Sequence, residues 1–174
     1  MRLEALKADA DIQVLTQWIA HAAAWRLLDA VSIRPRLPKN NGLEAEDRPK
    51  QFYYLIYPLN GDRPRGHVGL FGIDWTAGTA WLDIGLGDRS PWGDGCGADA
   101  LQVILRWGFD ELDLGCILIG VFDYDARAIL AYEEAGFAIR GRILQEAGRA
   151  GQSRAGMYLG LRRGEWDRIV KRET

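Results

Sequence analysis

The stretch Asp83–Ala98, with the sequence DIGLGDRSPWGDGCGA, decides how the rest of the chain can be arranged. An apolar run typical of a β-strand leads into it, and a helical pattern of apolar residues starts at Cys96. Glycine recurs at positions 93, 95 and 97, where the absence of a Cβ lets the backbone approach a ligand closely. The start of a helix adds N–H groups without intrahelical partners and the positive end of the helix dipole. Strand, glycine loop and helix together predict an anion site suited to phosphate.

Length and composition are those of an ordinary globular protein. The chain has 174 residues, 48% hydrophobic and 26% charged, so we expect a single domain over residues 1–174. Its net charge of −2 gives no basic excess for nucleic acid, and no apolar run reaches the length of a membrane span. Two cysteines, Cys96 and Cys116, are too few for a disulfide framework, so we expect a cytoplasmic protein. The histidines, His21 and His67, lie too far apart to suggest a metal site.

Upstream of the glycine-rich stretch, the sequence predicts helices followed by antiparallel strands. Arg2–Lys7 alternates between polar and apolar residues and could form a short strand. Two helical patterns follow, one that ends at Ile19 and one over Ala22–Ala30, and Ile33–Pro49 is predicted to be a proline-rich loop. Three strand-like segments follow at Gln51–Leu59, Gly66–Asp74 and Ala80–Leu86. Because short turns such as Asn60-Gly61-Asp62 join them, we expect an antiparallel meander.

Downstream of the glycine-rich stretch, apolar residues at helical spacing predict a helix from Cys96 to about Asp113. The continuous apolar run Cys116–Phe122 is typical of a buried strand, parallel to Ala80–Leu86 through a right-handed crossover. The pattern over Ala126–Ala135 predicts a short helix, and Phe137–Leu144 with Ala155–Leu161 predicts a closing hairpin. The charged tail, Arg162–Thr174, is expected to form a last helical turn. The predicted fold class is therefore α+β, with a mixed, mostly antiparallel sheet flanked by helices.

Two segments resemble motifs of the GNAT acetyltransferase superfamily. Trp92–Ala98 (WGDGCGA) is similar to the W-G-x-G-x-G pyrophosphate loop of its ribosomal-protein N-terminal acetyltransferase (RimJ/RimL) branch. A second motif of that branch, V-x3-N-x-R-A-x3-Y-x3-G-F, is matched by Val121, Asp125, Arg127, Ala128, Tyr132 and Glu134–Phe137. The order of elements over residues 66 to 161 is also that of the family. The resemblance implies a GNAT-like sheet in which the one parallel strand pair is splayed.

The resemblance also implies acetyl-coenzyme A as the co-substrate and names the residues that hold it. In the family, a bulge in the strand before the glycine loop turns backbone N–H groups toward the thioester. The residues expected to contact the cofactor are Ile84, Gly85, Leu86, Arg89, Trp92, Gly93, Asp94, Gly95, Cys96, Gly97, Ala98, Asp125 and Ala128. Two of them depart from the family pattern: Asp94 replaces a commonly basic residue and Asp125 replaces asparagine, while Arg89 or Arg127 could offset the charge of Asp94.

Acetyl transfer from a thioester to an amine needs an acid for the leaving thiolate and a base for the amine. The resemblance places Tyr132 at the position of the acid, and a phenol with an ordinary pKa of about 10 is well matched to an alkyl thiol. An alkylamine is mostly protonated at neutral pH, and Asp83 is the first candidate for its base. Asp74 is a second candidate, whereas His67 is expected to be structural and Cys96 is not expected to be a nucleophile.

Other acids could attract a cationic acceptor, namely Asp29, Glu44, Glu46 and Asp47. The leading hypothesis is an N-acetyltransferase that acts on a primary amine, a peptide N-terminus or a small molecule, by direct attack in a ternary complex. A non-enzymatic acyl-coenzyme A-binding module is the first alternative, motivated by Asp94 and Asp125. A nicotinamide-dinucleotide oxidoreductase is a weaker one, because Gly93-x-Gly95-x-x-Ala98 also fits a dinucleotide fingerprint. A homodimer is expected by analogy with the family, with no nucleic-acid or membrane partner and no metal.

Overall fold

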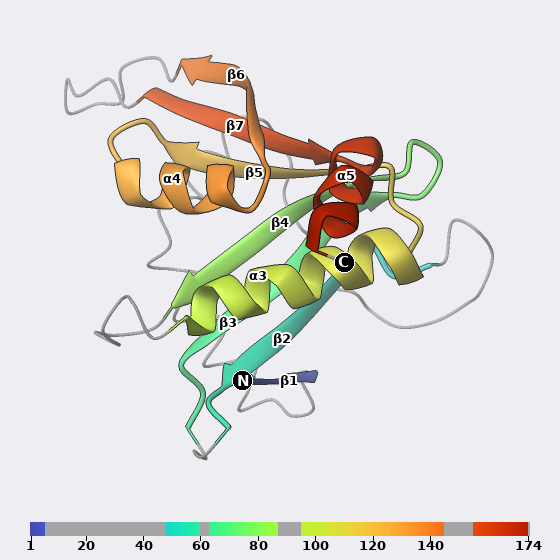
Figure 1. Ribbon diagram of the computed structural model, residues 1–174, viewed down its shortest axis with the longest axis vertical. Coiled ribbons are helices and arrows are strands. Elements are labelled where there is room, and N and C mark those ends of the chain that lie inside the picture. Colours follow the sequence, from blue (N-terminus) through green and yellow to red (C-terminus); the bar gives the residue numbers. More distant parts are fainter. Residues whose placement is uncertain (6–47, 60–62, 87–94, 145–154, 174) are drawn as a thin grey trace.

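The chain folds around a seven-stranded mixed sheet with the strand order β1-β2-β3-β4-β5-β7-β6 (Figure 1). The computed structural model describes residues 1–5, 48–59, 63–86, 95–144 and 155–173. Helices α3 (Cys96–Arg106), α4 (Ala126–Glu134) and α5 (Arg163–Glu173) flank the sheet. This is the mixed α+β, GNAT-like architecture predicted from the sequence.

Three consecutive strands form the expected antiparallel meander, and the first strand of the chain adds to its edge. Their bounds are Arg2–Ala5 for β1, Gln51–Tyr57 for β2, Gly66–Asp74 for β3 and Thr79–Leu86 for β4. Each pairs antiparallel with the next. The two helices and the loop predicted within residues 8 to 47 lie outside the described residues, as does the turn at residues 60 to 62.

The crossover from β4 to β5 (Cys116–Phe122) runs through α3 and makes the one parallel pair of the sheet, as predicted. This parallel pairing spans only three residue pairs, from Thr79 with Cys116 to Trp81 with Leu118. Beyond Trp81 the two strands separate, which Figure 1 shows as the divergence of β4 from β5. β5 instead continues alongside β7 (Ala155–Arg162) over its whole length.

The splay does not arise from the expected bulge in Ile84–Leu86. The register of β4 against β3 is continuous from Gly66 with Leu86 to Phe71 with Trp81, and the only register shift of this pair falls between Phe71 and Asp74. The strands separate because the parallel ladder stops, not because β4 carries an extra residue. The bulge implied by the resemblance is therefore wrong at this position.

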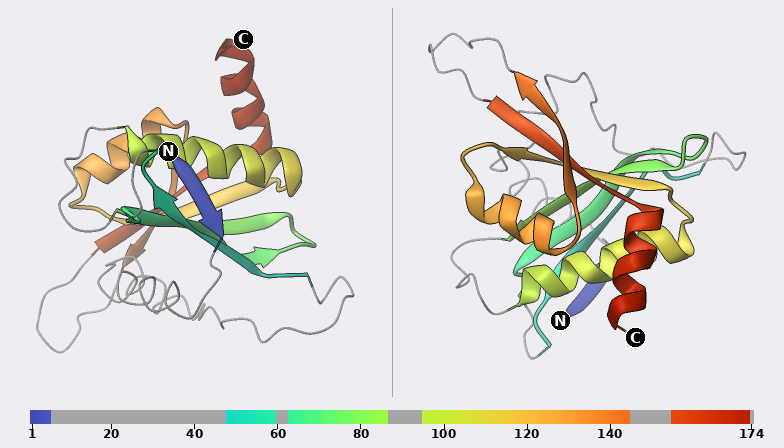
Figure 2. Two further views of the ribbon diagram at one scale, coloured as in Figure 1. Left: turned by 90° about the horizontal axis from the view of Figure 1, so that it is seen from below. Right: turned by 45° about the horizontal axis from the view of Figure 1, so that its top comes forward.

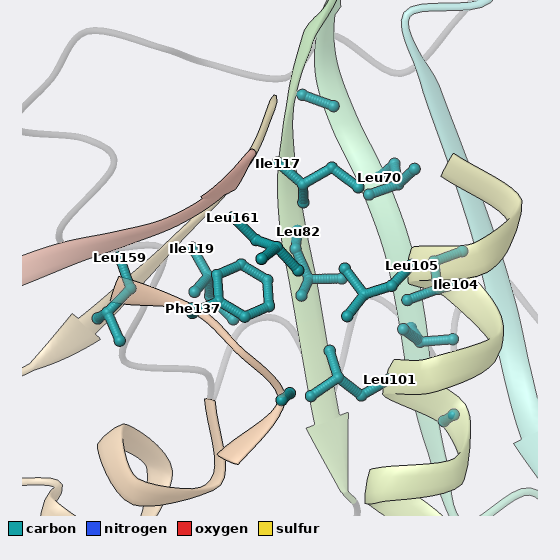
Figure 3. Close-up of a cluster of buried hydrophobic side chains, with 14 of the residues drawn as sticks. Leu70, Leu82, Leu101, Ile104, Leu105, Ile117, Ile119, Phe137, Leu159 and Leu161 are labelled. Atoms are coloured by element: carbon teal, nitrogen blue, oxygen red, sulfur yellow. The ribbon is translucent and has the colours of Figure 1, made fainter. Parts of the chain in front are cut away.

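The main core lies between the sheet and α3. Leucine and isoleucine side chains of the helix meet those of the central strands, and Figure 3 labels Leu70, Leu82, Leu101, Ile104, Leu105 and Ile117 in this cluster. Fully burying each such side chain stabilises the fold by about 1.5–3 kcal/mol. Figure 2 (left) shows α3 and α4 over the same face of the sheet. Beyond α3, residues Trp107–Glu111 form a π-helical turn whose Gly108 packs against Ile117, where an added Cβ would lie 2.9 Å from Cδ1.

The C-terminal part matches the prediction in type but not in length. β6 (Ala138–Leu144) and β7 form the expected antiparallel hairpin. The predicted last helical turn is in fact the 11-residue helix α5. Trp166, 1% exposed, explains the difference, because its ring stacks on Phe109 with centroids 5.6 Å apart and holds the charged helix on the core. Within the residues that the structure describes, no helix combines the length and apolarity needed to cross a membrane.

Candidate active site

A cavity of about 420 Å³ opens where β4 leaves β5, between the start of α3 and the side of α4. Its lining is mainly apolar or small. The residues are Ile84, Leu86, Gly95, Gly97, Ala98, Leu101, Gln102, Ala128, Ala131, Tyr132, Glu134 and Ala135. Of the predicted site residues, the structure thus brings together the strand end, the helix start, Ala128 and Tyr132.

The start of α3 presents backbone donors to this cavity. Gly95 is the N-cap and has the left-handed φ of 77°, which favours glycine. Its carbonyl accepts the first intrahelical bond, from the Asp99 N–H at 2.9 Å, so the N–H groups of Gly97 and Ala98 have no carbonyl partner within the helix. Gly97 also lets the helix approach β4, since a Cβ there would lie 3.1 Å from Cδ1 of Leu86. This end of the cavity is suited to an anionic group.

Helix α4 supplies Tyr132 to the other side of the cavity. Ala128, Ala131, Tyr132 and Ala135 recur at helical spacing and line the cavity as one face. The Tyr132 ring packs edge-on to Phe137 with centroids 6.0 Å apart. Burial, followed by the charges of Asp83 and Asp125, raises the pKa of the Tyr132 phenol above its ordinary value. The hydroxyl is protonated at neutral pH, as an ordinary phenol is, and burial makes it a weaker acid than an exposed tyrosine.

Asp83 lies on the opposite face of β4 from Ile84, because successive residues of a strand alternate between faces. It is 6% exposed, and its Oδ2 accepts a hydrogen bond from Nε2 of His67 on β3 at 3.2 Å. Tyr53 of β2 lies on the same face, in register with Gly69 and, through it, with Asp83. Burial and then the charge of Asp83 raise the pKa of the Tyr53 phenol.

Three further predicted site residues can be placed. Asp125 is the N-cap of α4 and accepts the Ala128 N–H at 3.1 Å, so its carboxylate binds the helix end, where a negative charge is favourable. Cys96 is buried in the main core rather than in the cavity wall. Gly85 faces His67, and an added Cβ would lie 2.5 Å from Cε1 of that ring.

Asp74, the second candidate for the base, lies at a turn away from the cavity. Its Oδ1 accepts the N–H groups of Thr76 and Ala77, both at 2.9 Å, in the turn that precedes β4. That turn lies at the end of β4 away from Leu86 and the cavity. A carboxylate that ends a strand binds nearby backbone N–H groups readily, which explains why the sequence alone could not separate Asp74 from Asp83.

Several predicted residues cannot be placed. Arg89, Trp92, Gly93 and Asp94 lie outside the described residues, and so do the acids Asp29, Glu44, Glu46 and Asp47. The sequence prediction in turn omitted cavity residues of the two helices, which are Leu101, Gln102, Ala131, Glu134 and Ala135. Helical spacing from Ala98 and Tyr132 would have found most of them.

The cavity has the features that an acyl-coenzyme A needs. Its apolar walls suit the pantetheine arm, and its helix start suits a diphosphate. Among the described residues, no cluster of three or more histidine, cysteine or acidic side chains could hold a metal ion.

Comparisons with known proteins agree with this geometry. Residues 1–138 match the family described as acetyltransferase (GNAT) domain. The chain therefore belongs to the GNAT acetyltransferase family. A comparison with curated proteins gives no match.

Solved structures share the fold at low sequence identity. A mutant of the spermidine N-acetyltransferase from Vibrio cholerae is 17% identical, with a TM-score of 0.72, covering 98% of this chain and 99% of that one. A dodecameric structure of spermidine N-acetyltransferase from the same organism is 17% identical, with a TM-score of 0.69 and 95% of each chain covered. A putative acetyltransferase from T. thermophilus is 20% identical, with a TM-score of 0.59, covering 72% of this chain and 65% of that one.

Proposed function

We propose that this protein is an acetyl-coenzyme A-dependent N-acetyltransferase that acts on a primary amine by direct attack in a ternary complex. The observation that carries the proposal is one cavity lined by the start of α3, by Ile84 and Leu86 of β4 and by Tyr132 of α4. Membership of the GNAT family supports the same reaction class.

Each part of the cavity has a role in this proposal. When bound, acetyl-coenzyme A supplies an acetyl group activated as a thioester. The N–H groups of Gly97 and Ala98 bind its diphosphate, and the apolar wall formed by Ile84, Leu86 and Ala128 holds its arm. Tyr132 gives its hydroxyl proton to the departing sulfur. In this proposal the amine arrives at the far face of β4, where Asp83 lies.

The acceptor is a primary amine of one of two kinds. The spermidine N-acetyltransferases among the similar structures favour a small polyamine. The resemblance of Trp92–Ala98 to the RimJ/RimL loop favours a peptide N-terminus instead. The chemistry at the nitrogen is the same for both.

A thiol-release assay with acetyl-coenzyme A tests the proposal, using spermidine and short peptides with free N-termini as acceptors. We expect Tyr132→Phe to lower kcat about 10²–10⁴-fold, because it keeps the ring and removes the proton. Tyr124→Phe is the matched control, since Tyr124 is 65% exposed and outside the cavity. Wild-type turnover by Tyr132→Phe would remove that residue from the mechanism. Calorimetric binding of coenzyme A without turnover of any amine would favour the acyl-coenzyme A-binding module instead.

The expected homodimer and cytoplasmic location remain proposals. Multi-angle light scattering of the purified protein would measure the mass of the assembly, and a mass other than that of two chains would contradict the homodimer. Fractionation of the producing cells would test the location.

A further inference from the structure

A buried polar cluster, Tyr53–His67–Asp83, occupies the face of the sheet opposite α3. Its members come from three neighbouring strands, β2, β3 and β4. His67 and Asp83 are the two buried polar or charged residues of the described chain, at 1% and 6% exposure. The sequence analysis treated His67 as structural and Asp83 as an isolated base, whereas the structure places their side chains in contact.

The fold makes room for this cluster with two glycines. A Cβ on Gly85 would lie 2.5 Å from Cε1 of His67, and a Cβ on Gly69 would lie 2.5 Å from Cδ1 of Tyr53. Real Cβ atoms do not approach other atoms so closely, so each ring occupies space that only glycine leaves open. Both glycines lie directly across the ladder from the ring that they admit.

Stability alone does not account for a buried Asp–His contact. Removing a carboxylate from water costs more than a single hydrogen bond returns, and apolar residues of similar volume often stabilise a core better than a buried ion pair does. The opposite face of the same strands is filled with such residues, including Val68 and Leu82. The cluster is thus the exception in an otherwise apolar sheet centre.

The position of the cluster connects it to the cavity. Asp83 follows Trp81, the last residue of β4 paired with β5, by two positions. It also directly precedes Ile84, which lines the cavity, so the cluster lies at the point where the two strands separate. Burial, and with it the charge of Asp83, raises the pKa of Tyr132 on the cavity side and that of Tyr53 on the far face.

We propose that His67 is a positioning residue that holds the Asp83 carboxylate and shares with it the proton that the acceptor amine loses. This inference rests on the proposed N-acetyltransferase function. Within it, His67 acts through Asp83, and Asp83 is the group that faces the amine.

The protons and electrons balance as follows. The ammonium gives one proton to the Asp83–His67 pair, and the freed electron pair on nitrogen forms the C–N bond. The C–S bond breaks with its electron pair going to sulfur, which takes the Tyr132 hydroxyl proton. The nitrogen then loses a second proton, which returns to the Tyr132 oxygen. The Asp83–His67 pair releases the proton that it took up to solvent. One amide, one thiol and one released proton result.

The test compares His67→Gln with the wild-type protein over a range of pH and with two amines. Glutamine can place an N–H near the position of Nε2 but cannot take up a proton. With an alkylamine at neutral pH we expect kcat to fall on the order of 10²-fold, with KM for acetyl-coenzyme A unchanged. The deficit should shrink as the pH rises toward the amine pKa of about 10, because more of the amine then arrives neutral.

An amine whose pKa lies below the assay pH is the internal control. It needs no base, so His67→Gln should use it at close to the wild-type rate, which also shows that the variant is folded. Asp83→Asn is the second variant, because it keeps the size of the side chain and should show the same dependence on the amine.

Two outcomes separate the inference from the function on which it rests. A wild-type protein that binds acetyl-coenzyme A but acetylates no amine would contradict the proposed function, and this inference with it. An active wild-type protein whose His67→Gln and Asp83→Asn variants match it at every pH would overturn the inference alone. So would equal losses with both amines in a variant of normal melting temperature, since these indicate a purely structural role.

Discussion

Beyond Trp81, β4 carries apolar side chains on one face, whereas the other face carries the carboxylate of Asp83 and the glycine Gly85. Ile84 and Leu86 line the cavity beneath α3 and α4, while Asp83 contacts His67 on the far face. Both sets come from one strand because side chains alternate along it, so a shift of one residue in register would exchange them. The comparison shows how a single strand can separate an apolar cavity wall from a buried polar contact.

The largest effect on stability is expected from a substitution that removes an apolar side chain of β4 from the core. Leu82→Ala removes a side chain that is 3% exposed and lies in the main core, next along the strand from Asp83. We expect the free energy of unfolding to fall by about 2–5 kcal/mol, since the cavity left behind adds to the lost burial. Urea denaturation measures this. Val103→Ala, at a position 48% exposed, is the control and should cost far less.

A smaller effect on stability is expected from a substitution that adds a side-chain atom next to His67 on the polar face of β4. Gly85→Ala forces the His67 ring away from its place over β4, because the new Cβ would lie 2.5 Å from Cε1. We expect a loss of about 1–3 kcal/mol from this overpacking, measured by urea denaturation. Activity should fall together with stability.

Gly120→Ala is the matched control for that substitution. It lies on the neighbouring strand β5, where an added Cβ would meet no atom within 4 Å. If Gly85→Ala proves as stable and as active as Gly120→Ala, then the tight seating of His67 has no consequence.

The smallest effect is expected in the free energy of unfolding at alkaline pH, to which a tyrosine on each face of the sheet contributes. The pKa values of Tyr53 and Tyr132 are raised in the folded protein, so the unfolded chain releases these protons first as the pH rises. Stability is therefore fully retained below the ordinary phenol pKa of about 10 and falls above it, by at most ~1.4 kcal/mol per pH unit for each phenol. Melting temperatures between pH 8 and pH 11 measure the slope, and Tyr53→Phe should flatten it. A slope unchanged in that variant would contradict the assignment.

Much of the fold could be predicted because its patterns are local. The apolar spacing of α3 and the continuous apolar run of β5 each indicate their structure without tertiary information. The length of α5 could not be predicted, since a mostly charged helix is held by the packing of Trp166 on Phe109. The expected bulge in β4 came from the family resemblance and not from this chain, whose ladder with β3 is regular there.

The site was predictable to the extent that it depends on single segments. The glycine loop and the motif containing Tyr132 drew attention to the two helices that line the cavity. The contact between His67 and Asp83 was not predictable, because it joins residues 16 positions apart whose meeting depends on the exact register of a hairpin. A lone histidine in a strand carries no signal of its partner.

The short parallel ladder between β4 and β5 divides the sheet into two unequal parts. One part contains β1 to β4 and the other β5, β7 and β6. They are joined by the strand pairs from Thr79 with Cys116 to Trp81 with Leu118 and by the N–H groups of Gly115 and Cys116, which donate to the Gly78 carbonyl. The angle at this joint sets how widely the two parts stand apart, and hence the width of the cavity between them. Under the proposed function, we therefore expect substitutions at this joint, for example at Ala80 or Ile117, to change the affinity for acetyl-coenzyme A although neither residue lines the cavity.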